Sequence, residues 1–234
     1  MYFCTPQLQR QHKFDKNDMK IKCEGTYLSQ ADKMKILGVT FDKYLSWAEH
    51  IDKVAKDGFS TLQTLKLLRR LLSFKVRVQL VTTLVLSKLD YGNVLLCNLP
   101  LHLQRKLQKV QNAAAGFALR KHAGIEDVLK LSWLPTLERT EYAVAVLAFK
   151  AMHHHSPNNI NVKIKENKRN LRSDRDVGIM ITYDEPAKTF QYDAKRVFNN
   201  LPQVIRESTN IQSFKHKKKF QIKNFFWIKL RLEF

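Results

Sequence analysis

The chain has 234 residues, 44% of them hydrophobic, which is enough to bury a core in one domain or two small ones. Its 41 Lys and Arg residues against 21 Asp and Glu residues give a formal net charge of +20. A surplus of this size favours a polyanionic partner, either nucleic acid or an acidic membrane surface. Three widely spaced cysteines, Cys4, Cys23 and Cys97, argue against a disulfide-stapled secreted protein. Because no run of about 18 uncharged apolar residues occurs either, we expect an intracellular, soluble protein.

The N-terminal part favours strands and then a helix. Strand-forming residues between positions 19 and 42, with Gly25 and Gly38 at turns, predict a small β-hairpin. Ser46 and Glu49 have the spacing of a capping box, in which each side chain accepts a hydrogen bond from the other residue's backbone N–H. A helix should therefore begin at Ser46. Its predicted apolar stripe is Ile51, Val54, Ala55, Gly58, Leu62, Leu65 and Leu72.

Further helices follow in the central part of the chain. Ser73 can cap a second helix, and residues 75–89 are apolar on nearly every face, as in a helix packed between neighbours. Pro100 is placed to open a third helix. A short helix is predicted over residues 126–131, and Thr136 can cap a helix that ends near Met152. The apolar stripe of the third helix is Leu103, Leu107, Val110, Ala114 and Phe117, and that of the last is Leu137, Tyr142, Val146 and Phe149.

The C-terminal part mixes lysines with aromatic residues. Two short helices are predicted near residues 193–200 and 210–226. In the second, lysines alternate with rings: Lys215, Lys217, Lys218, Lys219 and Lys223 with Phe220, Phe225, Phe226 and Trp227. This mixture suits single-stranded nucleic acid, a membrane surface, or a terminal helix that docks its rings into the core.

These patterns predict a mainly α-helical fold in four parts. Residues 1–44 form a β-hairpin region, and residues 45–152 form a bundle of helices. Periodicity fails over residues 153–187, which predicts a linker or an irregular excursion. Residues 188–234 form a less ordered, basic and aromatic helical extension.

The sequence contains few groups suited to catalysis. Two-metal polymerase chemistry needs clustered carboxylates, usually with adjacent aspartates, and the chain has no Asp-Asp pair. His153, His154 and His155 lack Cys or carboxylate partners for a metal, and a helix end that complements the dipole is the better interpretation. We therefore expect no enzyme activity from this chain alone, no metal, no cofactor and no small-molecule substrate.

A set of short motifs occurs in a characteristic order along most of the chain. They are Met34-Lys35-Ile36-Leu37-Gly38-Val39, Leu45-Ser46-Trp47, His50-Ile51, Leu67-Leu68-Arg69-Arg70, Leu89-Asp90-Tyr91-Gly92, Leu107-Gln108-Lys109-Val110-Gln111-Asn112-Ala113-Ala114, Trp133-Leu134-Pro135, Phe149-Lys150-Ala151, Leu171-Arg172-Ser173, Phe198-Asn199-Asn200-Leu201-Pro202 and Ser213-Phe214-Lys215. This ordered set resembles the part after the palm in the reverse transcriptases of jockey-like and chicken-repeat-like non-LTR (LINE) retrotransposons.

The resemblance implies roles for the predicted parts. The hairpin with Leu37, Gly38 and Val39 would be the primer grip, the helical bundle the thumb, and the remainder the family's C-terminal extension. The palm with its catalytic aspartates would lie before Met1, which makes the chain a catalytically incomplete fragment. The family also implies a nuclear location.

The basic residues of the bundle are the candidate nucleic-acid contacts. The set is Lys53, Lys56, Lys66, Arg69, Arg70, Arg105, Lys106 and Lys109. We expect them to bind the phosphates of an RNA–DNA or DNA duplex without reading sequence, with a palm domain supplied in trans as a further partner. Nucleic acid ranks ahead of a membrane as the partner. The alternatives are a protein- or membrane-surface interaction module, or a decayed transposon product without function.

Overall fold

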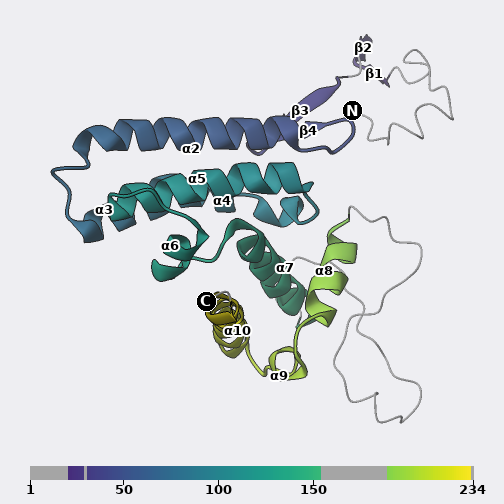
Figure 1. Ribbon diagram of the computed structural model, residues 1–234. Helices are drawn as coiled ribbons and strands as arrows, with labels where there is room; N and C mark the ends of the chain where they lie inside the picture. Colours follow the sequence, from purple (N-terminus) through teal and green to yellow (C-terminus); the bar gives the residue numbers. More distant parts are fainter. Residues whose placement is uncertain (1–20, 29–30, 154–188, 233–234) are drawn as a thin grey trace, which may run out of the picture.

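Two small β-hairpins precede a set of helices in the computed structural model, which describes residues 21–28, 31–153 and 189–232 (Figure 1). β1 (Ile21–Cys23) pairs antiparallel with β2 (Thr26–Leu28), and β3 (Lys33–Ile36) pairs antiparallel with β4 (Val39–Asp42). The two pairs form separate two-stranded sheets. The predicted mainly α-helical fold with a small N-terminal hairpin region is confirmed, with two hairpins where one was expected.

The first long helix, α2 (Ala48–Leu68), buries the predicted stripe. Its buried residues include Ile51, Ala55, Gly58, Leu62 and Leu65. The predicted capping box, however, is wrong. The N-cap residue is Trp47, whose φ of 63° is left-handed and which makes no side-chain cap, and Glu49 reaches Lys33 at 2.6 Å instead of its own helix start.

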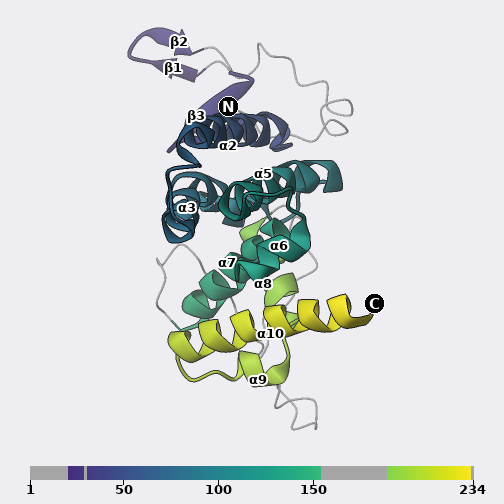
Figure 2. The ribbon, with the colours of Figure 1, turned by 60° about the vertical axis from the view of Figure 1, so that its left-hand side comes forward.

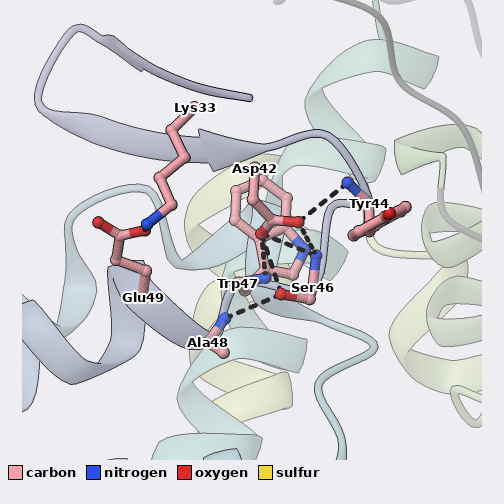
Figure 3. A network of polar contacts seen from close by, with 7 residues as sticks. All are labelled: Lys33, Asp42, Tyr44, Ser46, Trp47, Ala48 and Glu49. Carbon is pink, nitrogen blue, oxygen red and sulfur yellow. Dashed lines mark hydrogen bonds and ion pairs between the residues drawn. The ribbon is translucent and has the colours of Figure 1, made fainter. Parts of the chain in front are cut away.

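Asp42 at the end of β4 organises the start of α2 in place of the capping box (Figure 3). Its carboxylate accepts hydrogen bonds from the backbone N–H groups of Tyr44, Ser46 and Trp47 at 2.9 to 3.1 Å, and from the Ser46 hydroxyl at 3.0 Å. Partial burial works to raise the pKa of Asp42, but these hydrogen bonds lower it below its usual value. The hairpin and the helix are therefore joined through one carboxylate.

The second helical segment is continuous but contains a π-helical turn between two α-helical parts. α3 (Phe74–Val81) passes through a π-helical turn, η1 (Thr82–Leu86), into α4 (Ser87–Asp90). The predicted Ser73 cap is confirmed, because its hydroxyl accepts from the Val76 N–H at 3.4 Å. The segment buries Val81, Val85, Leu86 and Leu89, yet Val76 is 40% exposed and Leu84 is 42% exposed. It is thus covered on one face, and not on all sides as predicted.

After a short 3-10 turn, η2 (Asn93–Leu96), helix α5 (Leu101–Leu119) packs along α2 in the same direction (Figure 1). Near the helix starts, Lys106 forms an ion pair with Asp52. At the far ends, the Arg120 guanidinium donates to the carbonyl of Arg69 at 2.9 Å. Pro100 precedes α5 as predicted, and the predicted stripe of the helix is buried throughout.

Helices α6 (Ile125–Lys130) and α7 (Thr136–Met152) follow close to their predicted positions. Thr136 does not cap α7 as expected, since its backbone N–H and its hydroxyl both donate to the Gln108 side-chain carbonyl at 3.0 Å. The predicted stripe is also wrong in phase. Phe149 is buried, whereas Leu137 is 37% exposed and the buried face consists mainly of Thr140, Val144, Ala145, Ala148 and Met152.

A second core forms around α7, on the side of the molecule opposite α2 (Figures 1 and 2). α8 (Phe190–Asn199) and α10 (Ile211–Leu232) pack against α7, with α9 (Gln203–Arg206) between them in the chain. The Phe214 ring stacks on Phe149 at 4.4 Å between ring centroids and on Phe198 at 6.1 Å. The Arg139 guanidinium reaches across to the Asp90 carboxylate and joins α7 to α4.

The basic, aromatic tail is described only in part. Phe214 docks into the core, as one of the three interpretations expects, whereas Phe220 is 60% exposed. The side chains of Lys223, Phe225, Phe226 and Trp227 lie outside the described residues, and so does the predicted linker over residues 154–187. Among the described helices, none combines the length and the apolarity needed to cross a bilayer.

Replacing Asp42 with Ala should lower the free energy of unfolding by about 1–3 kcal/mol, because three backbone N–H groups lose a charged acceptor. The matched control is Glu49→Ala, which removes only an exposed ion pair and should cost less stability than Asp42→Ala. Chemical denaturation of both variants measures the difference. A larger loss for Glu49→Ala than for Asp42→Ala would instead favour the capping box.

Candidate nucleic-acid interface

A groove of about 410 Å³ runs between the C-terminal halves of α2 and α5. Residues from both helices and from the chain just after α5 line it: Phe59, Leu62, Lys66, Arg69, Lys109, Asn112, Ala113, Gly116, Phe117, Lys121, His122 and Ala123. The floor is apolar and the rims are polar or charged. Because the two helices run side by side, the rim residues form two rows that face the same opening.

Two glycines set the geometry of this groove. A Cβ added at Gly58 would lie 2.7 Å from Cγ1 of Val110, so glycine allows α2 to approach α5 closely. A Cβ at Gly116 would lie 2.7 Å from the carbonyl oxygen of Lys121. Gly116 therefore lets the chain fold back over the end of α5, which brings Lys121 and His122 to the rim.

Three predicted contacts come together at the groove. Lys66 and Arg69 belong to α2, and Lys109 belongs to α5. Within the described part of the chain, none of the residues that line the groove is acidic, and these three cations have no ion-pair partner there. Like charges held close together repel one another, so an anion bound between them stabilises the arrangement.

Sequence reasoning missed three lining residues. Lys121 and His122 follow the last turn of α5, and the basic run that begins at Arg120 was the available signal. The Lys121 ammonium lies 2.5 Å from the Asp127 carboxylate. This hydrogen bond is the main cause that lowers the pKa of Asp127 below its usual value. Phe59, 43% exposed, gives the groove an aromatic edge that the apolar pattern did not predict.

Three of the four other predicted residues near the groove extend its basic surface. Arg105 is exposed one helical turn before Lys109 and shares its side of α5. Lys56 is exposed on α2, three residues before Phe59, and Arg70 is exposed beyond the helix end. Lys106 is the exception, because its ammonium is already paired with Asp52.

Lys53 lies apart from this surface. It lines a separate cavity of about 220 Å³ together with Gly38, His50, Val54, Asp57, Lys88 and Tyr91. His50 is buried there, and burial together with the nearby Lys53 lowers its pKa, so the imidazole is neutral at pH 7. The structure therefore does not bring Lys53 together with the groove residues.

The hairpin turn assigned to a primer grip packs against the turn after α4. Leu37 and Gly38 form the two-residue connection of β3 and β4, both with positive φ, at 46° and 85°. The Tyr91 hydroxyl donates to the Leu37 carbonyl, and the Tyr91 ring lies against Gly38. Val39 is buried, and its side chain lies against Gly92. Leu37 itself points outward and is 85% exposed.

Among the described residues, no group of three or more His, Cys, Asp or Glu side chains converges. His153 ends α7 and its ring packs on Phe149 at 4.3 Å. His154 and His155 lie outside the described residues. The polar groups that line the groove are Lys66, Arg69, Lys109, Asn112, Lys121 and His122.

Replacing Gly116 with Ala should destabilise the fold by about 1–3 kcal/mol, because the added methyl group meets backbone and not a movable side chain. Gly124→Ala is the control, since a Cβ there meets nothing within 4 Å. Thermal unfolding of both variants compares the two losses. Equal stability of Gly116→Ala and the natural chain would refute the close approach at Lys121.

The groove and the hairpin turn are each built by segments far apart in the chain. No family model, curated protein or solved structure matches the chain.

Proposed function

We propose that this chain is the region after the palm of a non-LTR retrotransposon reverse transcriptase, and that its α2–α5 groove binds the phosphate backbone of a primer–template duplex. The observation that carries the proposal is the convergence of Lys66, Arg69 and Lys109 on one groove whose described lining contains no carboxylate. Contact with RNA–DNA or DNA is non-specific in sequence, because cations that reach phosphates carry no base information.

The form of the groove supports a polyanion over a single small anion. Arg105, Lys109 and Asn112 follow one side of α5, while Lys66 and Arg69 follow the facing side of α2. A backbone with regularly spaced phosphates can occupy such rows at several points at once, and each contact releases counterions. The partly exposed Phe59 ring adds a surface against which a sugar or an unpaired base can pack.

The contacts between motif segments support the family part of the proposal. Gly38 lies against Tyr91 and Val39 lies against Gly92, although the members of each pair are more than 50 positions apart in the sequence. The Tyr91 hydroxyl also donates to the Leu37 carbonyl. Two other motifs, Leu67-Leu68-Arg69-Arg70 and the segment from Leu107 to Ala114, contribute both sides of the groove. The shared motifs thus occupy the positions that build the proposed interface.

The proposed role is binding without catalysis. The sequence has no adjacent aspartate pair, and a palm would hold the catalytic ions in the proposed family. We therefore propose no catalytic residue and no cofactor within the chain. The matching location is the nucleus, where a primer–template on chromosomal DNA is found.

The test compares duplex binding by the natural chain with binding by the triple variant Lys66→Gln, Arg69→Gln and Lys109→Gln. Fluorescence anisotropy with an RNA–DNA duplex, titrated across salt, measures the slope of log affinity against log salt. Loss of three phosphate contacts should reduce the magnitude of this slope by about 2–3. The affinity at low salt should fall by about tenfold or more.

The matched control removes the same number of charges elsewhere, as Lys22→Gln, Lys35→Gln and Lys150→Gln. Lys22 and Lys35 lie on the hairpins and Lys150 lies on α7. If general attraction by the net charge were responsible, both triple variants would weaken binding equally, and the groove assignment would be wrong. Absence of duplex binding by the folded natural chain would reject the proposed function itself.

A further inference from the structure

The connection between α2 and α3 exposes a cluster of apolar side chains, here named the apolar tip. Its members and their exposed fractions are Leu67 at 83%, Leu68 at 50%, Leu71 at 83%, Phe74 at 51% and Val76 at 40%. Single exposed leucines are ordinary, but five large apolar side chains within ten residues form a patch that marks a binding surface.

The backbone of the apolar tip is held in place by two arginines. The Arg120 guanidinium donates to the carbonyls of Arg69 at 2.9 Å and Arg70 at 3.0 Å. The Arg77 guanidinium, on a side chain only 6% exposed, donates to the carbonyl of Leu72 at 2.6 Å and to that of Ala118 at 2.9 Å. Leu67 and Leu71 therefore project from a connection that is tied to α5 and cannot fold back without breaking these bonds.

Positive charge surrounds the apolar tip. Lys66, Arg70 and Lys75 are exposed and Arg69 is partly exposed. Residues 58–89 contain six Lys and Arg residues, Lys66, Arg69, Arg70, Lys75, Arg77 and Lys88, and no Asp or Glu. A partner must therefore combine an apolar interior with an anionic surface.

We propose that the apolar tip inserts into the surface of an anionic lipid bilayer, with Leu67, Leu71 and Phe74 among the acyl chains and Lys66, Arg70 and Lys75 at the headgroups. A bilayer presents an apolar layer beneath an anionic one. The apolar side chains of the tip match the first layer, and the cations around it match the second. A bilayer contact of this kind would add a second anionic surface to the proposed duplex binding.

Other occupants fit the apolar tip less well. A standard protein–protein interface involves about 20–30 residues and roughly 800 Å² from each partner, more than five side chains provide. A second copy of this chain would bring the same cations against each other. Nucleic acid complements the charge, but four of the five apolar side chains are aliphatic and cannot stack on bases as aromatic rings do.

The position of the apolar tip in the fold permits this contact. Figure 1 shows the α2–α3 connection at one extremity of the molecule, beyond the ends of α2 and α5 and away from α7, α8 and α10. A flat surface can reach it without meeting the second core. The groove lies along α2 and α5, and it shares only Lys66 and Arg69 with the surroundings of the tip.

Vesicle co-sedimentation of the full chain tests the proposal, with phosphatidylcholine vesicles that contain either no or about one third phosphatidylserine. We expect binding only to the anionic vesicles. The variant Leu67→Ser with Leu71→Ser should lose roughly tenfold in partitioning for each leucine. Arg70→Gln with Lys75→Gln should lose about fivefold for each charge.

The control is Ile36→Ser with Val204→Ser, which changes aliphatic side chains that are 42% and 68% exposed but lie outside the tip. It should leave vesicle binding unchanged, and circular dichroism should show the same helix content for all variants. The proposal is overturned if the natural chain ignores anionic vesicles, or if the leucine variant binds them as well as the natural chain.

Duplex anisotropy on the same variants separates this proposal from the function proposed above. The leucine variant should keep its duplex affinity, whereas Lys109→Gln, which alters the groove away from the tip, should weaken duplex binding and leave vesicle binding unchanged. A different outcome is that the natural chain binds no vesicles and the leucine variant loses duplex affinity. The apolar tip would then be a wedge that inserts into nucleic acid.

Discussion

The close packing of α2 on α5 is the constraint on which the rest of the structure depends. At Gly58 there is no room for a side chain, because a Cβ would stand 2.7 Å from Val110. Two helices that run side by side in the same direction bring the residues along their facing rims together. The groove, the ion pair of Lys106 with Asp52 and the Arg120 contacts at the far end all follow from that one approach.

Helix faces were predictable where a strong apolar stripe faces one large neighbour. The stripes of α2 and α5 are buried nearly as the spacing indicates, and the Ser73 cap forms. Local patterns failed where a residue outside the motif supplied a better partner. Asp42 replaces the capping box of Ser46 and Glu49, and Gln108 takes both donors of Thr136. The phase of α7 was missed because α8 and α10 cover it, and no spacing within α7 reveals them.

The candidate site was predictable as a set of cations but not as a surface. A helical pattern shows that Lys53 and Lys66 both point away from the core stripe, yet only tertiary packing decides that they serve different cavities. Lys121 and His122 were missed for a related reason. They reach the groove only because Gly116 lets the chain turn back across the end of α5, which is a contact between backbones.

Lys66 and Arg69 belong to two surfaces at once, since they line the groove and also flank the exposed leucines of the α2–α3 connection. Two polyanions that draw on the same cations cannot be bound independently, so the affinity for one depends on the occupancy of the other. By linkage this dependence is reciprocal: a bound duplex must weaken attachment at the tip by the factor by which attachment weakens duplex binding. A single pair of side chains would then make the molecule a switch between two anionic surfaces, with no conformational change.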